Sequence, residues 1–314
     1  MKLPNFLVIG AARAGTTALY QALQHHPEVF LPKAVKETYF FSQIDGKPYP
    51  EEYSNAAYHS LTHYRDLYKG AKAFRVIGEI CNSYLYYFDR SIENILKILG
   101  RDVRIVILLR DPVERAYSNY LLHVRDGMET LSFQDALDFE DSRIRDRWWW
   151  GYYYKHVGLY SRQVEAYLSV FGDHVCILFY DQFKQFPLEF FEHVERHLRV
   201  GKRCLHVKSE YVNSSGLPRN RLISRLLNIR DPLRPWLMAM VPRQLRAVAW
   251  TCLAPIALRK PPPMPEECRE LLQRYFEPDL VRLRTLLNAC PMTTNIPAWL
   301  IGTPKYVSTQ ENHG

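Results

Sequence analysis

Four short apolar runs in the first 180 residues are continuous rather than alternating. They are FLVI at 6–9, RVIGEI at 75–80, RIVILLR at 104–110 and HVCILFY at 174–180. A continuous run is typical of a strand buried on both faces, because covering helices contact every side chain of it. The runs therefore predict the strands of a mostly parallel sheet.

Segments with the spacing of helices lie between these runs. We expect helices beginning after Thr17 and over 90–99, 112–125, 160–171 and 183–198. Pro112 suits a first helical turn, because that position needs no backbone N–H donor. The alternation of strand and helix predicts an α/β fold of three layers, with a central sheet flanked by helices.

The pattern changes beyond residue 200. Residues 219–258 look helical, 259–265 are a proline-rich loop, and 266–287 have the period of a long amphipathic helix. We predict a single domain over 1–314. Its parts would be a nucleotide-binding α/β core over about 1–200, a helical and loop region over about 201–300 that closes the sites, and a frayed tail at 302–314.

Charge and cysteine content narrow the choice of partner. The net charge of +8 favours an anionic partner. Because the basic residues are scattered, we expect a pocket for a phosphorylated small molecule and no nucleic-acid partner. None of the six cysteines is spaced C-x-x-C, so no zinc site is expected. The cysteine pattern suits a reducing compartment, and no signal peptide or spanning helix is evident, so we predict a cytoplasmic protein.

The first apolar run leads into a loop bounded by two glycines. Gly10 and Gly15 have the spacing G-x-x-x-x-G, and Thr16 and Thr17 follow at the start of the expected helix. The backbone N–H groups and the dipole of a helix N-terminus favour a bound phosphate. A nucleoside triphosphatase has a lysine directly after the second glycine, where this chain has Thr16. The cation of this loop is Arg13, which indicates another kind of phosphate site.

The third apolar run ends in a second cationic pattern, RDPVERAYSNY at 110–120. A helix that begins at Pro112 would aim Arg110 and Ser118 at one ligand. A guanidinium suits bidentate binding of phosphate, and a serine hydroxyl adds a neutral donor. The two patterns together resemble the motifs of the sulfotransferases that use 3′-phosphoadenosine 5′-phosphosulfate (PAPS). The second pattern matches at every named position, and RAGTT matches the first motif except at Arg13, where the family has a lysine.

This resemblance, which extends over about residues 5–290, implies a donor site. The family's first motif cradles the 5′-phosphosulfate and its second motif holds the 3′-phosphate. The donor contacts implied by these motifs are Arg13, Ala14, Gly15, Thr16, Thr17, Arg110 and Ser118. The loop ARKPPPMP at 257–264 resembles the family's loop over the 3′-phosphate and adds Arg259 and Lys260. PAPS would be the donor and adenosine 3′,5′-bisphosphate (PAP) the product, and no metal would be required.

The resemblance also implies a catalytic base. KETYFF at 36–41 is similar to the E-x-x-F-F segment of the glycan-modifying branch, whose glutamate is the base, and this glutamate corresponds to Glu37. Arg13 would stabilise the charge that develops on the leaving group. A guanidinium stays protonated, so we expect slower turnover than with a lysine, or a rearranged contact.

The acceptor side is less defined. Candidate acceptor contacts are Lys36, Glu79, His123 and His156. The aromatic run RWWWGYYYKH at 147–156 is either the edge of the core or a platform for an acceptor. The apolar segment 236–256 is either core helices or a patch for a lipid-like acceptor, which leaves a peripheral membrane contact open. A small-molecule, glycan or lipid-like acceptor fits these features.

Two other functions compete with sulfuryl transfer. A P-loop kinase that uses ATP and Mg²⁺ would need a lysine in place of Thr16 and a clear Walker-B acid. A non-catalytic nucleotide-binding protein would have no need of Glu37 beside an intact loop. Both features of the sequence favour the sulfotransferase.

Overall fold

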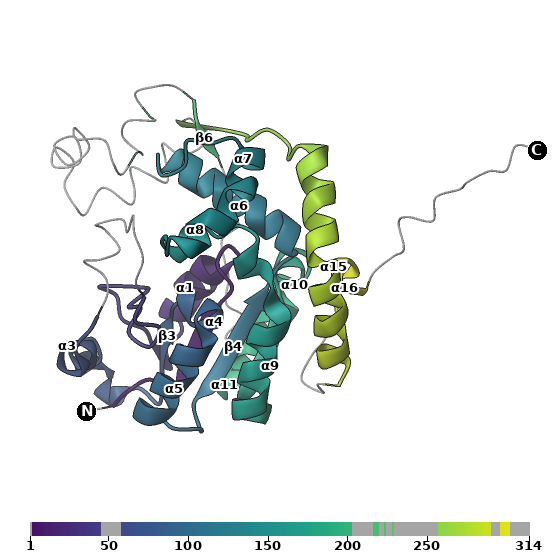
Figure 1. Ribbon diagram of the computed structural model, residues 1–314. Coiled ribbons are helices and arrows are strands. Elements are labelled where there is room, and N and C mark those ends of the chain that lie inside the picture. The colour runs from purple at the N-terminus through teal and green to yellow at the C-terminus, as the bar shows by residue number, and fades with distance from the viewer. Residues whose placement is uncertain are drawn as a thin grey trace, which may run out of the picture.

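The computed structural model of the chain describes residues 2–44, 58–202, 216–219, 223, 228, 257–289 and 296–301. Helices surround a central sheet in Figure 1. The sheet has five strands in the order β2-β3-β1-β4-β5. The strands are β1 (Phe6–Gly10), β2 (Val29–Phe30), β3 (Val76–Ile80), β4 (Arg104–Leu109) and β5 (Val175–Phe179). All four pairings are parallel, which confirms the expected α/β fold.

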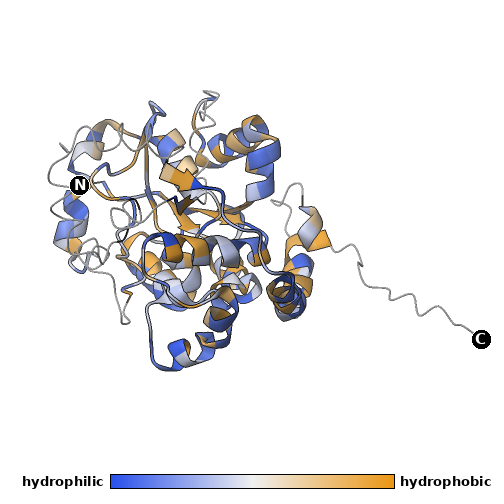
Figure 2. Cartoon of the chain, turned by 90° about the horizontal axis from the view of Figure 1, so that it is seen from above, coloured by the Kyte–Doolittle hydropathy of each residue, from blue (hydrophilic) through white to orange (hydrophobic). Residues whose placement is uncertain are grey.

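The four longer strands are the four apolar runs of the sequence. Every residue of β1, β3 and β5 is buried, and in β4 only Arg104 is partly exposed. The view from above in Figure 2 shows the hydrophobic strands at the centre of the molecule. Each large apolar side chain buried here contributes about 1.5–3 kcal/mol, so the continuous runs are stable only between two layers of helices.

The longer helices lie close to their expected positions. They are α1 (Thr16–Gln24), α5 (Phe88–Ile98), α6 (Pro112–Arg125), α9 (Tyr160–Phe171), α11 (Pro187–Leu198) and α15 (Glu266–Asn288). The expected helix over 183–198 is instead two helices, because α10 (Tyr180–Gln185) ends before Pro187. The proline ring disfavours helical dihedrals in the residue before it, and Phe186 has φ −134° and ψ 61°.

Several short elements were not expected from the sequence. The short helices are α3 (Leu61–Asp66), α4 (Ser83–Tyr86), α7 (Phe133–Asp138), α8 (Glu140–Arg145) and α16 (Ala298–Ile301). The 3₁₀ turns are η1 (Lys69–Ala73), η2 (Trp150–Tyr152), η3 (His156–Gly158) and η4 (Gly172–His174). Strands β6 (Leu217–Pro218) and β7 (Leu258–Arg259) pair antiparallel. Elements of two to six residues carry too little periodicity to be seen in a sequence.

Some predictions fall outside the described residues. Most of the expected helical stretch 219–258 and the whole tail 302–314 are among them. The division of 1–314 into a core, a closing region and a tail therefore stays a prediction. Within the described part of the chain, no helix combines the length and the apolar character that crossing a membrane requires.

The carboxyl ends of the parallel strands meet at one edge of the sheet. The loop of Gly10–Gly15 follows β1, Asn82 follows β3, Arg110 follows β4 and Tyr180 follows β5. Ligands bind at this edge in open α/β sheets, because the loops and the helix N-termini converge there. The sheet thereby brings together residues that lie up to 170 positions apart in the sequence.

Candidate active site

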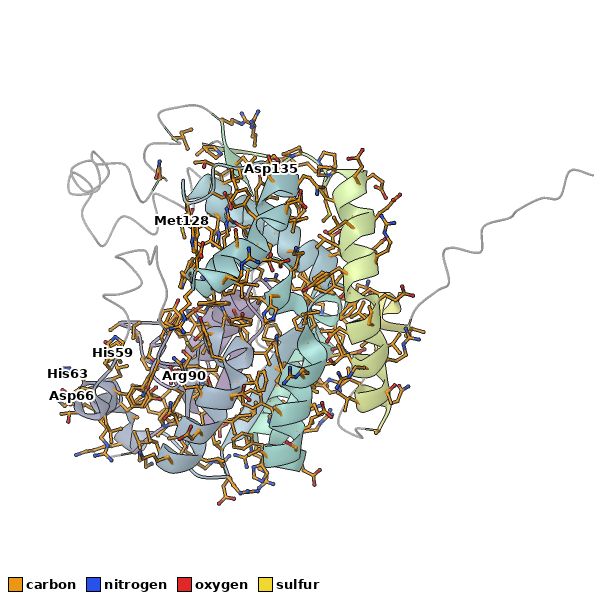
Figure 3. All side chains as sticks on the ribbon, in the orientation of Figure 1. His59, His63, Asp66, Arg90, Met128 and Asp135 are labelled. Atoms are coloured by element: carbon orange, nitrogen blue, oxygen red, sulfur yellow. The ribbon has the colours of Figure 1, made fainter. Side chains whose placement is uncertain are left out.

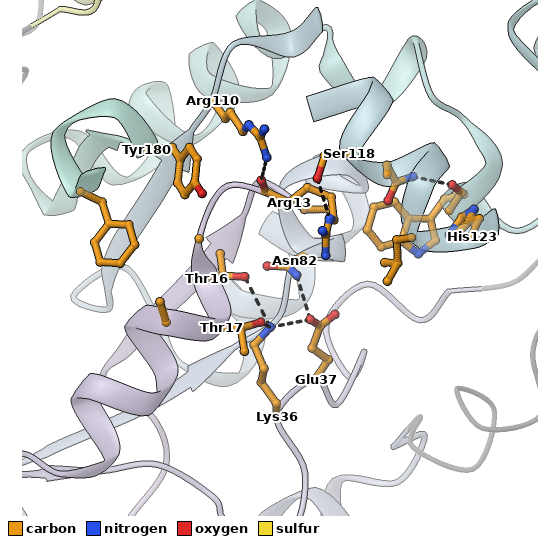
Figure 4. Close-up of a pocket in the computed structure, with 18 of the residues that line it drawn as sticks. Arg13, Thr16, Thr17, Lys36, Glu37, Asn82, Arg110, Ser118, His123 and Tyr180 are labelled. Atoms are coloured by element: carbon orange, nitrogen blue, oxygen red, sulfur yellow. Dashed lines mark hydrogen bonds and ion pairs between the residues drawn. The ribbon is translucent and has the colours of Figure 1, made fainter. Parts of the chain in front are cut away.

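A cavity of about 410 Å³ opens at this edge of the sheet. Figure 4 shows the side chains that surround it. The cavity gathers most of the candidate residues from the sequence, namely Arg13, Gly15, Thr16, Thr17, Lys36, Glu37, Arg110, Ser118 and His123. The two sequence patterns and the segment KETYFF therefore meet at one site, although they lie on separate elements.

The glycine loop forms the floor of the cavity. Gly15 is the N-cap of α1 and has φ +95°, a conformation that L side chains rarely adopt. A Cβ atom at this position would lie 3.1 Å from the ring of Tyr180. The N-terminus of α1 receives no side-chain cap, and Thr16 and Thr17 line the cavity. The N–H of Ala14 donates to the carbonyl of Ala11 at 3.2 Å, so Ala14 supports the loop from within.

Lys36 connects the glycine loop to the predicted base. Its Nζ donates to Glu37 Oε1 at 2.8 Å, to Thr17 Oγ1 at 3.3 Å and to Thr16 Oγ1 at 3.4 Å. These bonds are the dashed lines around Lys36 in Figure 4. The predicted acceptor contact of Lys36 stays a prediction, and the structure adds that its ammonium group also contacts the glycine loop.

Arg13 turns away from this junction and bonds to the second pattern. Its Nε donates to Ser118 Oγ at 3.1 Å, and Arg110 Nη1 donates to the carbonyl of Arg13 at 3.1 Å. Burial, followed by repulsion from Arg125 and Arg110, lowers the pKa of Arg13 to about 10. The guanidinium is thus protonated at neutral pH, and a bound anion would relieve the repulsion. Arg110 also lies 4.8 Å from the centre of the Tyr180 ring.

The opposite side of the cavity is aromatic. In Figure 4 His123 lies across the cavity from Tyr180, with Arg13 and Ser118 between them. Trp149 and Trp150 line the cavity and are 4% and 5% exposed, and the ring of Trp149 lies 5.5 Å from that of His123. The interpretation as core is confirmed for Trp149 and Trp150, and the role as a platform for an acceptor stays a prediction, since these rings also line the cavity.

His123 and Glu37 each have a polar partner that orients them. The Nδ1 of His123 is 3.1 Å from the hydroxyl of Tyr154. Asn82 Nδ2 donates to Glu37 Oε1 at 2.8 Å, which is the oxygen that Lys36 also contacts. The carboxylate of Glu37 is therefore held by one cation and one amide, with a fifth of its side chain exposed.

Five candidate residues do not line this cavity: Ala14, which is fully buried, and Glu79, His156, Arg259 and Lys260. Glu79 is buried behind it, where the hydroxyls of Tyr64 and Tyr84 each donate to its carboxylate at 2.6 Å. His156 lines a second cleft, and its Nδ1 is 2.9 Å from the hydroxyl of Tyr86. Arg259 is in β7 and Lys260 follows it, both exposed to solvent.

Residues that sequence reasoning missed also line the cavity. They include Tyr39, Asn82, Asn119, Tyr180, Phe183 and Lys184. Tyr180 directly follows β5, and Asn82 lies two residues beyond β3. The strand-end rule that drew attention to Arg110 would have found both, had it been applied to every strand. The described residues contain no group of three or more His, Cys, Asp or Glu side chains that could hold a metal ion.

Comparison with known proteins agrees with this geometry. A family model described as "Sulfotransferase family" matches residues 4–201. The chain belongs to this family. The crystal structure of a sulfotransferase from Alicyclobacillus acidocaldarius superimposes with a TM-score of 0.70 at 27% identity, covering 95% of this chain and 99% of that one. The predicted family and fold are therefore confirmed.

Curated sulfotransferases match part of the chain. Mouse heparan sulfate glucosamine 3-O-sulfotransferase 3B1 is 28% identical over 173 residues, which are 54% of this chain and 39% of that protein. Human carbohydrate sulfotransferase 15 is 28% identical over 170 residues, which are 43% of this chain and 30% of that protein. The chain thus covers less than half the length of these two relatives.

Proposed function

We propose that this sulfotransferase moves the sulfuryl group of PAPS to a hydroxyl or an amine of a glycan acceptor, with Glu37 as the base. The observation that carries the proposal is the junction at Lys36. One ammonium group contacts both threonines of the glycine loop and the carboxylate of Glu37. A base within one side chain of the anion-binding loop can reach an acceptor that attacks a group bound on that loop.

The cavity has the charge that a polyanionic donor needs. The cations Arg13, Lys36, Arg110 and Lys184 line it, against the single carboxylate of Glu37. The phosphosulfate would lie at the N-terminus of α1, where the helix dipole and Lys36 favour an anion. The 3′-phosphate would lie near Arg110 and Ser118, as the family motif implies. Arg13, bonded to Ser118, connects the two ends of the donor site.

The reaction forms one bond to sulfur and breaks another. The acceptor oxygen attacks the sulfur atom while Glu37 takes the proton of the acceptor hydroxyl. The bond between sulfur and the bridging oxygen of the 5′-phosphate breaks, and its electron pair stays on PAP. Lys36 and the N–H groups at the start of α1 would stabilise that negative charge. Preorganised donors of this kind typically contribute a factor of about 10²–10³ each.

The glycan acceptor rests on two lines of support. The curated relatives carry the names of heparan sulfate and carbohydrate sulfotransferases. Trp149 and Trp150 line the cavity beside His123, with the ring of Trp149 5.5 Å from that of His123, and aromatic faces suit the apolar faces of sugar rings. The cytoplasmic location and the peripheral membrane contact stay predictions.

The decisive experiment is a transfer assay with labelled PAPS over panels of glycans, lipids and phenols. We expect transfer to glycans, and Glu37→Gln lowers the rate by about 10²–10⁴-fold because general-base assistance is lost. Binding of PAP by Glu37→Gln stays at the wild-type level. Glu93→Gln, at an exposed position of α5, is the matched control and keeps full activity.

Two results would contradict the proposal. Full activity of Glu37→Gln would remove Glu37 as the base. Binding of ATP with Mg²⁺ in place of PAP would remove the donor. Transfer to lipids or phenols alone would retain the mechanism and replace the acceptor class.

A further inference from the structure

A second cleft lies beside the active-site cavity and takes no part in the mechanism above. Its volume is about 450 Å³. It lies among the turn between α4 and α5, the first turn of α9, and α15, and these helices pack against one another. Figure 1 shows α4, α5 and α9 next to each other, and Figure 3 labels Arg90, which is one of the lining residues.

Arginines from three helices converge on this cleft. Arg90 comes from α5, Arg162 from α9 and Arg282 from α15. Arg90 is anchored by a bond from Nη1 to the carbonyl of Gln43 at 2.7 Å, and Arg282 lies 3.5 Å from the exposed Glu165. Arg162 is exposed and makes no hydrogen bond or ion pair with the part of the chain that the structure describes. Guanidinium groups so placed can bind a carboxylate or a sulfate.

Aromatic rings and hydrogen-bond acceptors complete the lining. The rings of Tyr86 and Tyr87 are 4.9 Å apart and nearly perpendicular, so they present two different faces. Gln163 is 4% exposed, and its carboxamide oxygen has no partner among the described residues. Aromatic faces, guanidinium groups and amide or carboxylate acceptors are the groups that bind the faces, the acidic groups and the hydroxyls of a sugar.

The cleft shares a wall with the active-site cavity. The ring of Tyr86 stacks on Trp150 at 6.0 Å and 17°, and Trp150 lines the active-site cavity. The short helix α4 connects the same two places. Its N-cap Asn82 bonds to Glu37, and its last residue Tyr86 lines the cleft. One turn of helix spans about 6 Å, so an oligosaccharide could contact both places at once.

We propose that this cleft binds an acidic sugar unit of the acceptor, beside the sugar that receives the sulfuryl group. The proposal rests on the proposed function for its acceptor class and adds a second contact outside the catalytic cavity. The ligand is acidic because the described lining holds three arginines against two carboxylates, those of Asp89 and Asp279, and the guanidinium of Arg162 has no ion-pair partner among the described residues. The ligand is a sugar because aromatic rings, guanidinium groups and amide acceptors line the cleft together, next to the catalytic cavity with which it shares the Tyr86–Trp150 wall.

The test is calorimetric titration of the full chain, saturated with PAP, with a heparan sulfate hexasaccharide. We expect wild-type protein to bind, and the double variant Arg162→Glu/Arg282→Glu to bind at least about tenfold more weakly, since charge-assisted hydrogen bonds are lost. PAP affinity stays unchanged, because neither residue lines the catalytic cavity. The matched control is Arg274→Glu, an exposed arginine on α15 that does not line the cleft. This control binds the hexasaccharide as wild type does.

Several outcomes would overturn the cleft as an acidic-sugar site. They are no hexasaccharide binding by wild type, equal binding by the double variant, and an equal loss in Arg274→Glu. Binding of a second equivalent of PAP that the double variant loses would make the cleft a nucleotide site. Hexasaccharide binding without any sulfuryl transfer would contradict the proposed function and leave the cleft proposal standing.

Discussion

Glu37 and Glu79 both lie next to Thr38 but have opposite surroundings. Glu37 precedes Thr38 in the sequence, and Glu79 accepts a hydrogen bond from its hydroxyl. Glu37 lines the cavity, with its side chain 20% exposed, and contacts Lys36 and Asn82. Glu79 is 1% exposed and accepts hydrogen bonds from three hydroxyls, those of Thr38, Tyr64 and Tyr84. Thr38 follows Glu37 in the sequence, so the buried cluster holds the loop that carries the predicted base.

The difference in exposure between Glu37 and Glu79 shows that burial decides whether a glutamate can react with a ligand or only support the structure. A partly exposed carboxylate beside a cation can take a proton from an acceptor that enters the cavity. A carboxylate enclosed by hydroxyl donors is satisfied internally and holds the loop in place. Desolvation raises the pKa of Glu79, and desolvation also raises the pKa of its donors Tyr64 and Tyr84 well above the ordinary tyrosine value.

We expect the largest change in activity when the ammonium group beside Glu37, that of Lys36, is removed. Lys36→Ala removes the ammonium group shared by the loop and the base. We expect kcat to fall by about 10²–10³-fold, because charge on the leaving phosphate loses a preorganised donor. Single-turnover transfer from labelled PAPS measures the effect. Lys33→Ala, at an exposed position three residues earlier, serves as the control. An unchanged rate in Lys36→Ala would show that Lys36 only binds Glu37.

The second prediction compares how much the loss of each glutamate lowers the free energy of unfolding. Glu79→Ala leaves three buried hydroxyl donors without an acceptor and lowers the free energy of unfolding by about 3 kcal/mol. Glu37→Ala changes it by less than about 1 kcal/mol, because the ion pair of Glu37 is partly exposed. Urea unfolding of both variants gives the two values. The distinction fails if Glu37→Ala proves the more destabilising of the two.

The third prediction concerns how the free energy of unfolding depends on pH through the buried carboxyl group of Glu79. The pKa of Glu79 is raised above 4.5 in the folded state, chiefly by desolvation. A raised acid binds its proton more tightly in the folded protein, so its contribution to stability is complete below about pH 4.5 and is lost as the pH rises through the folded-state pKa. We expect Glu79→Gln to reduce the decline in stability between about pH 5 and about pH 8. Urea unfolding at both pH values measures it, and an equal decline in wild type and variant would assign the pH dependence to other groups.

The smallest effect is expected at the loop position where the family has a lysine. Arg13→Lys loses the bond to Ser118 but keeps a positive charge, and Lys36 already places an ammonium group at the loop. We therefore expect kcat to change by less than about tenfold, which is about 1.4 kcal/mol of barrier. Steady-state kinetics with saturating PAPS measures it. A fall of more than tenfold would show that the site depends on the guanidinium itself.

Much of the fold could be predicted because its signals are local. The strands β1, β3, β4 and β5 are continuous apolar runs, which are typical of strands buried on both faces of a sheet. The helices α6 and α9 have the expected bounds. The two patterns that are predicted to bind phosphate lie at strand ends, where open α/β sheets bind their ligands. The strand β2 and the break before Pro187 were missed, since the first is two residues long and the second interrupts a continuous helical pattern.

The sequence predicted the residues of the site that lie in its motifs, but not those that tertiary packing brings to it. Residue type and order marked Glu37, Arg110 and Ser118, but could not say which of two glutamates would be enclosed. Lys36 was predicted only as an acceptor contact, because the sequence shows that it precedes Glu37 but does not show that its ammonium group contacts Thr16 and Thr17. Asn82 and Tyr180 enter the site only because β3 and β5 end at the same edge as β1.

The sequence by itself determined the α/β sheet, the glycine loop at the start of α1 and the cationic pattern that begins at Arg110. Each of these depends on neighbours within one or two turns of chain, so each leaves a local signature. The tertiary structure alone decided that Arg13 bonds to Ser118, that Lys36 joins the loop to Glu37, and that Glu79 is buried. These contacts join segments 19 to 105 residues apart or enclose a side chain on all sides, and packing in three dimensions settles both.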